Sequence, residues 1–206
     1  LAKSAEDQLN KYGFSHAESI YDEYNYVYHW DSTIKESIDI HRTAHVATLV
    51  SSVMTVLQKG RTDKAMYYDA QMILPEWNGI FRKEIKVFGE SYTILPEKPY
   101  YALKAWGMLK DLGNEVYSES NDDDVYVVAA ADPNTLRILI SYFNDDTGLR
   151  RTVLPQDRIR IDLGDLRPRR TEVRYLDNDR DFEPEELPDN ILTLDGNSFA
   201  LVTMDF

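Results

Sequence analysis

The sequence predicts an α/β part over residues 1–112 followed by an all-β part over residues 113–206. Before residue 113, helical patterns alternate with short strands, which is typical of βα units. After it, short β-rich runs are separated by Asp, Asn, Gly and Pro turns. With 43% apolar residues among 206, the chain can bury a core in one domain or two small ones.

The α/β part contains four expected elements: a helix ended by Gly13, a buried strand, a long helix ended by Gly60 and a second strand, at residues 2–11, 19–22, 33–58 and 64–69. Asp31 or Ser32 can cap the long helix, with Glu36 in its first turns. Two parallel strands cannot bury both faces without further strands alongside. We therefore expect this part to be the tail of a larger barrel.

An irregular loop follows over residues 73–98, with room for a hairpin through residues 85–94 turned at Gly89. Lys98-Pro99 then opens a helix that ends near Gly113, because proline suits a first helical turn and glycine a helix end. Five strands are expected in the all-β part, at residues 125–131, 136–143, 158–163, 171–176 and 199–204. Their number and spacing favour an antiparallel sandwich.

The candidate site is Glu23, a carboxylate at the end of the first expected strand. Catalytic side chains of α/β barrels project from that end of a strand. Aromatic residues follow it and offer the flat faces and polar groups that sugar rings need, at Tyr24, Tyr26, Tyr28 and Trp30. Aromatic strand ends also occur in interfaces and cores, and a single Glu after a strand is often only solvated.

Charge and composition exclude several classes of function. The formal charge of −13 argues against nucleic-acid or anionic-membrane partners, and the absence of cysteine excludes disulfides, thiolate catalysis and Cys-ligated zinc. The sequence has no membrane-spanning run and no glycine-rich phosphate loop, so neither a membrane nor a cofactor is expected. It begins without an initiator Met or signal peptide, and we expect it to belong to a longer protein.

Two motifs resemble metal sites and are interpreted otherwise. His41 and His45 have the spacing of a zinc pair, but Arg42 stands where the zinc-protease motif needs Glu, so a packed pair is expected. Residues 177–181 begin like a calcium loop, but Phe182 replaces the glycine that such a loop requires. We expect a solvated turn there and no metal site.

The chain resembles the C-terminal half of glycoside hydrolase family 39, which includes α-L-iduronidase and β-xylosidase. The resemblance rests on colinear segments: Ser-Ile-Tyr-Asp-Glu-Tyr-Asn-Tyr-Val-Tyr-His-Trp at 19–30, the helix after it, Tyr-Asp-Ala at 68–70, the Lys98-Pro99 helix and the β region. It implies a partial (β/α)8 TIM-barrel segment over residues 1–112 followed by a β-sandwich accessory domain over residues 113–206.

The resemblance also implies roles. Glu23 matches the catalytic nucleophile of a retaining glycosidase, Trp30 matches a tryptophan beyond it, and Asp69 matches an aspartate that contacts substrate. Asn25 falls in the substrate-contacting loop, and Trp77 can stack on a sugar as Trp30 can. The acid/base Glu of the family follows an Asn on an earlier strand; Asn114-Glu115 is a coincidental match, so residues 1–206 alone are expected to be inactive.

Two hypotheses remain open from the sequence. The first is a fragment of a retaining glycoside hydrolase acting on poly- or oligosaccharides, from a parent protein that is secreted or periplasmic. The second is a non-catalytic carbohydrate-binding or interdomain scaffold module. In the second hypothesis the aromatic loop either binds glycan or simply packs. The expected partner is a carbohydrate, and a barrel cut to two strands is expected to self-associate or to depend on the β domain for solubility.

Overall fold

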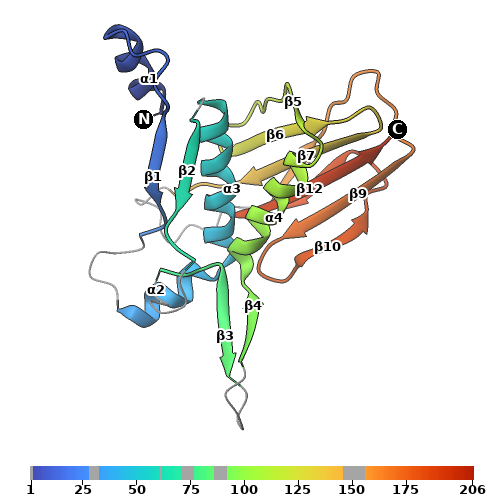
Figure 1. The fold of residues 1–206 in the computed structure, drawn as a ribbon. Helices are drawn as coiled ribbons and strands as arrows, with labels where there is room; N and C mark the ends of the chain where they lie inside the picture. The colour runs from blue at the N-terminus through green and yellow to red at the C-terminus, as the bar shows by residue number, and fades with distance from the viewer. Residues whose placement is uncertain (1, 28–32, 61, 71–76, 86–91, 146–155) are drawn as a thin grey trace.

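The structure is a computed structural model that describes residues 2–27, 33–60, 62–70, 77–85, 92–145 and 156–206. Helices α3 (Ala44–Lys59) and α4 (Lys98–Lys110) lie between a small parallel sheet and a larger antiparallel sheet (Figure 1). Mixed helix and sheet followed by antiparallel strands is the predicted fold class, which is confirmed.

The parallel sheet consists of β1 (Ile20–Tyr24) and β2 (Lys64–Tyr67). Its strands lie where the sequence places them, but the prediction that residues 19–22 are buried is wrong. Ile20 is 48% exposed and Met66 is 50% exposed, whereas Tyr24 is buried. The reason is that each strand pairs only with the other among the described residues, so much of the sheet faces solvent.

The long helix predicted over residues 33–58 is two helices, α2 (Ile34–His41) and α3. Thr43 is extended (φ −92°, ψ 164°), and its hydroxyl donates to the carbonyl oxygen of Ile40 at 2.8 Å. A Cβ on Gly79 would lie 2.0 Å from the His41 carbonyl oxygen, so a distant segment passes directly beside the break. The helical spacing of apolar residues cannot reveal such a tertiary contact.

The N-cap of α2 is Thr33, not Asp31 or Ser32, which lie outside the described residues. Thr33 Oγ1 accepts from the Glu36 backbone N–H at 3.3 Å, and the Glu36 carboxylate accepts from the Thr33 N–H at 2.9 Å. This reciprocal capping box satisfies two donors of the first turn and accounts for the predicted Glu36 at the helix start.

The predicted hairpin forms between β3 (Phe81–Ile85) and β4 (Tyr92–Pro96), although its turn at Gly89 lies outside the described residues. It projects from the same end of the molecule as α2 (Figure 1). Helix α4 begins at Lys98 with a proline in its first turn, as predicted. Gly113 follows it with a φ of 85°, a left-handed conformation open to glycine.

The larger sheet has six strands in the order β10-β9-β12-β7-β6-β5. Four of them were predicted within one or two residues: β6 (Val125–Ala131), β7 (Thr135–Tyr142), β9 (Arg170–Leu176) and β12 (Ser198–Asp205). β8 (Asp157–Arg160) is shorter than predicted and pairs outside this sheet with β11. Three strands were not predicted: β5 (Asn114–Val116), β10 (Asp181–Glu186) and β11 (Ile191–Leu194).

The two missed strands of the six-stranded sheet are its edges. Within the described ranges, β10 pairs only with β9, and β5 only with β6. An edge strand needs no apolar residues on both faces, and it tolerates a proline such as Pro184. The acidic run over residues 181–186 therefore carries little strand signal in the sequence.

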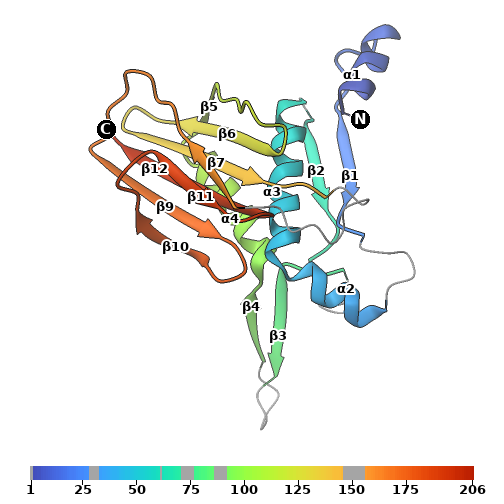
Figure 2. The ribbon, with the colours of Figure 1, turned by 180° about the vertical axis from the view of Figure 1, so that it is seen from behind.

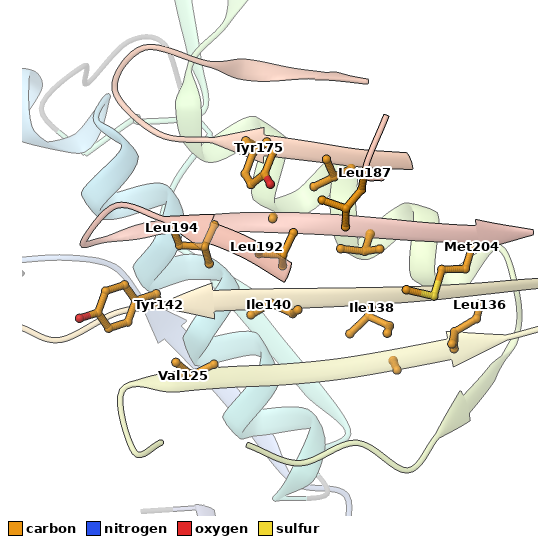
Figure 3. Close-up of a cluster of buried hydrophobic side chains, with 14 residues drawn as sticks. Val125, Leu136, Ile138, Ile140, Tyr142, Tyr175, Leu187, Leu192, Leu194 and Met204 are labelled. Atoms are coloured by element: carbon orange, nitrogen blue, oxygen red, sulfur yellow. The ribbon is translucent and has the colours of Figure 1, made fainter. Parts of the chain in front are cut away.

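One face of the six-stranded sheet packs against the β8–β11 pair (Figures 2 and 3). Apolar side chains at alternate positions of four strands meet Leu192 and Leu194 there, both fully buried. This two-layer packing of antiparallel strands is a sandwich with a small second sheet.

The other face packs against α3 and α4. Phe199, Leu201 and Leu139 from the sheet join Val50 and Ala105 from the helices in one buried cluster. Ser51 on α3 and Ser141 on β7 are also hydrogen-bonded at 2.6 Å between their hydroxyl oxygens. The two parts of the chain share this core, and their division at residue 112 stays a prediction.

The turn between β9 and β10 is built on Asp177, which is 5% exposed. Its carboxylate accepts from the backbone N–H groups of Asp179 and Arg180 at 2.9 and 2.7 Å, and from Arg180 Nε at 2.6 Å. The Arg180 guanidinium also lies 3.8 Å from the Tyr175 ring centre. The segment 177–181 is thus a turn held by protein donors.

We expect Asp177→Ala to lower the free energy of unfolding by about 1–3 kcal/mol at neutral pH, because it leaves three partly buried donors without their acceptor. Burial alone would raise the pKa of Asp177. The hydrogen bonds that its carboxylate accepts from the Asp179 N–H and from Arg180, together with the positive charge of Arg180, hold that pKa below its ordinary value. A lowered native pKa stabilises the fold above the unfolded pKa, and this contribution is lost as pH falls through the native pKa.

Urea unfolding at pH 7 and at pH 3 measures this effect. The difference between wild type and Asp177→Ala should shrink at the lower pH, and the exposed Asp179→Asn is the matched control. A pH-independent difference would contradict the assigned role of the carboxylate.

Candidate functional site

The candidate site lies at the carboxyl ends of β1 and β2. The two strands are parallel, with Tyr24 opposite Tyr67 near their ends, and their arrowheads point toward α2 and the β3–β4 hairpin (Figure 1). Loops that leave the same end of parallel strands are placed together, which is where α/β barrels carry their catalytic groups. Glu23, Asn25 and Asp69 all belong to this end.

Glu23 is exposed and lies within an irregularity of β1. Tyr21 pairs with Ala65 and Tyr24 with Tyr67, so three steps along β1 match two along β2. The extra residue shifts the register between Tyr21 and Tyr24 as a β-bulge does, and such irregularities re-aim side chains next to active sites. The direction of the Glu23 side chain at the end of β1 therefore does not follow from the regular alternation of side chains along a strand.

Asn25 ties three segments together. Its side-chain nitrogen donates to the backbone oxygens of Tyr68 and Trp77, the latter at 3.0 Å, and its side-chain oxygen accepts from the Tyr26 N–H at 2.7 Å. The loop after β1 is thereby fixed to the segment after β2. The Asn25 side chain thus positions the loop after β1 through its hydrogen bonds. Its predicted contact with substrate would be an additional role.

Asp69 follows β2 and is 7% exposed. It lies near Tyr67. The Tyr67 ring packs edge to face on the Tyr24 ring, with 5.6 Å between the ring centres. Burial raises the pKa of Tyr24 to about 12, and burial with the nearby Tyr24 and Asp69 raises the pKa of Tyr67. Both phenols therefore stay neutral near physiological pH and can donate hydrogen bonds.

Trp77 and Tyr68 supply the aromatic surface at this end. Their ring centres are 6.5 Å apart, and Trp77 also packs edge to face on His41 at 5.6 Å. Trp77 is half-buried and Tyr68 is 37% exposed. Trp30, the other predicted sugar-stacking residue, lies outside the described residues.

Two residues of this cluster were not predicted as part of the site. Tyr68 directly precedes Asp69, which was predicted as a site residue, and this adjacency could have indicated Tyr68 as well. His41 was interpreted as a packed helix residue, and it is 1% exposed. Its contact with Trp77, 36 positions away, has no counterpart in the local sequence pattern.

The arrangement combines an exposed carboxylate, a hydrogen-bonded amide and an aromatic surface at one strand end. These are the groups by which a protein holds a sugar ring and attacks or stabilises its anomeric carbon. Among the described residues, no cluster of three or more His, Asp or Glu side chains could hold a metal ion. No helix in the described ranges has the length and apolar content to cross a membrane.

Comparison with known proteins finds relatives in structure only. No family model matches the sequence, and no curated protein matches it. An endoxylanase of glycoside hydrolase family 30 from Clostridium papyrosolvens C71 aligns over 100% of this chain and 46% of its own, with 12% identity and a TM-score of 0.60. A glucosidase from Croceicoccus marinus aligns over 100% of this chain and 49% of its own, with 15% identity and a TM-score of 0.61.

A family 86 structure, BuGH86wt, was solved in complex with neoagarooctaose. It aligns over 98% of this chain and 32% of its own, with 12% identity and a TM-score of 0.66. The chain thus spans less than half the length of these solved structures. At such identities the likeness concerns the fold, and the chain has the fold of a portion of glycoside hydrolases.

Proposed function

We propose that this chain is the C-terminal part of a retaining glycoside hydrolase of the family 39 type. In this proposal, β1 and β2 are the last strands of a (β/α)8 barrel and the six-stranded sheet with β8–β11 is its accessory β-sandwich. The observation that carries it is an exposed carboxylate, Glu23, at a bulged strand end beside Asn25 and an aromatic surface. Likeness to glycoside hydrolases over the whole chain supports the same assignment.

Glu23 would be the nucleophile. In a retaining mechanism it attacks the anomeric carbon, a covalent glycosyl-enzyme forms, and water then hydrolyses it while a second carboxyl group acts first as acid and then as base. Asn25 would position the loop that follows Glu23 and β1, while Asp69 would bind substrate hydroxyls. Trp77, with Trp30, would stack on the apolar faces of sugar rings.

The acid/base carboxyl group would come from an earlier strand of a longer parent enzyme, about 5 Å from Glu23. Glu115 does not serve as this acid/base group in the proposal. It lies on β5 at the edge of the six-stranded sheet, and its carboxylate accepts a hydrogen bond from the Gln58 side chain. Residues 1–206 alone should therefore bind carbohydrate at most, without hydrolysing it.

The proposal is tested by trapping the covalent intermediate. The parent enzyme is incubated with 2-deoxy-2-fluoro glycosides of xylose, arabinose and iduronic acid that carry a good leaving group, and its peptides are then mapped by mass spectrometry. A glycosyl adduct on Glu23 is expected. An adduct on another carboxylate would overturn the assignment, and hydrolysis without any adduct would favour the scaffold interpretation of this segment.

We also expect residues 1–206 to self-associate in solution. β1 and β2 each have one unpaired edge among the described residues, and Ile20 and Met66 expose apolar surface next to them. Unpaired edges with apolar side chains recruit further strands. Light scattering across a concentration series should show dimers or larger species, and Ile20→Lys with Met66→Lys should reduce them, while the distant Tyr117→Ser should not. A monomer at every concentration would contradict this expectation.

A further inference from the structure

His41 is the last residue of α2 and is 1% exposed. It does not face solvent, and it is remote in sequence from every predicted site residue. Its ring nevertheless reaches the loop after β1 on one side and Trp77 on the other. A buried polar ring in such a place needs hydrogen-bond partners on both nitrogens.

Both ring nitrogens face carbonyl oxygens. Nδ1 lies 2.5 Å from the Ser37 oxygen, and Nε2 lies 2.7 Å from the Tyr26 oxygen. A carbonyl oxygen only accepts, and a neutral imidazole has only one N–H. A neutral ring therefore donates to one of the two carbonyl oxygens, and either tautomer holds the ring between α2 and the loop after β1.

The contacts of His41 converge on Asn25. The Tyr26 carbonyl that His41 binds follows Asn25 directly, and Trp77, on which the ring packs, provides the carbonyl that Asn25 binds. The backbone at Gly79 has no room for a side chain beside His41. The ring is thus enclosed by α2, the loop after β1 and the segment after β2.

We propose that His41 is a positioning residue whose ring fixes the loop after β1, which carries Asn25 and Tyr26, against Trp77. It acts through the Tyr26 carbonyl and does not touch substrate. The loop anchoring concerns this chain alone, whereas the consequence for catalysis rests on the function proposed above.

The first test uses the chain of 206 residues with 15N-labelled histidine, in which four side chains contribute signals. Long-range 15N–1H correlation spectra should show one histidine whose ring N–H proton exchanges slowly with solvent, and His41→Gln should remove that signal. The exposed His16→Gln is the control that should leave it in place. Rapid solvent exchange of the ring N–H assigned to His41 would overturn the proposal.

The second test separates anchoring from general stability. His41→Phe keeps an aromatic ring that can pack on Trp77 but removes both ring nitrogens, whereas His41→Gln keeps a donor where Nε2 lies. Hydrogen exchange at residues 25–27 should be faster in the Phe variant than in the Gln variant. Equal exchange in the two variants would mean that the ring fills space only.

In the parent enzyme, kcat should fall by up to about 100-fold in His41→Phe, because small displacements of catalytic groups have effects of that size. His41→Gln should recover part of the loss, with KM changed less than kcat. If the parent enzyme has no glycosidase activity at all, the proposed function fails, while the spectra and the exchange data still decide the inference on His41.

Discussion

Glu23→Gln in the parent enzyme is expected to lower kcat by roughly 10³- to 10⁶-fold on any glycoside that the enzyme hydrolyses. Glutamine has the size and shape of glutamate but cannot form the glycosyl ester. The fold should not suffer, because Glu23 is exposed. Initial rates on aryl xylosides, arabinosides and iduronides measure the effect, with circular dichroism to verify the fold.

Asp22→Asn is the matched control, since it removes a neighbouring exposed carboxylate from the same strand. It should leave kcat within a few-fold of wild type. Wild-type kcat in Glu23→Gln would place the nucleophile elsewhere and leave residues 1–206 as a scaffold. Loss of activity in both variants would indicate that the strand end is sensitive to any change and would leave Glu23 without a special role.

Phe199→Ala is expected to destabilise the chain by about 3–5 kcal/mol, the largest stability effect we predict for a single substitution. Phe199 is fully buried on β12, in the cluster that joins the six-stranded sheet to α3 and α4. Its ring lies 5.7 Å from that of Phe182. Truncation removes the transfer free energy of the ring and leaves a cavity between layers that cannot collapse freely.

Urea unfolding, monitored by circular dichroism, gives the change in free energy of unfolding. In thermal unfolding, the variant of a chain of this size should lose roughly 6–20 °C in Tm. Tyr117→Ala is the control, because Tyr117 is 84% exposed and should change stability by no more than about 0.5 kcal/mol. A loss below about 1 kcal/mol for Phe199→Ala would mean that sheet and helices are stable without this contact. The shared core would then not account for the packing of the two parts.

Local signals predicted much of the fold. The strand over residues 125–131 was placed without error, because its apolar run is bounded by turn residues on both sides. The helix from Lys98 and the left-handed Gly113 followed from the conformations that proline and glycine prefer. Edge strands escaped prediction, since a single partner and one covered face leave little trace in their composition.

The candidate site divides in the same way. Glu23 was identified because its position after a strand and the aromatic residues around it are all close in sequence. The Asn25 bonds to residues 43 and 52 positions away were beyond reach, as was the break after His41 that lets its ring enter the site. Trp30 and the roles of Asp69 and Trp77 stay predictions.

The sequence by itself determined most of the strands, the helix from Lys98, and a carboxylate at a strand end, because these depend on residues a few positions apart. Only the tertiary structure decided that one long helix is two, that β1 and β2 expose apolar surface, and that His41 joins Asn25 and Trp77. The physical reason is that burial and hydrogen-bond partners depend on which distant segments meet, and a local pattern of residues carries no record of that meeting.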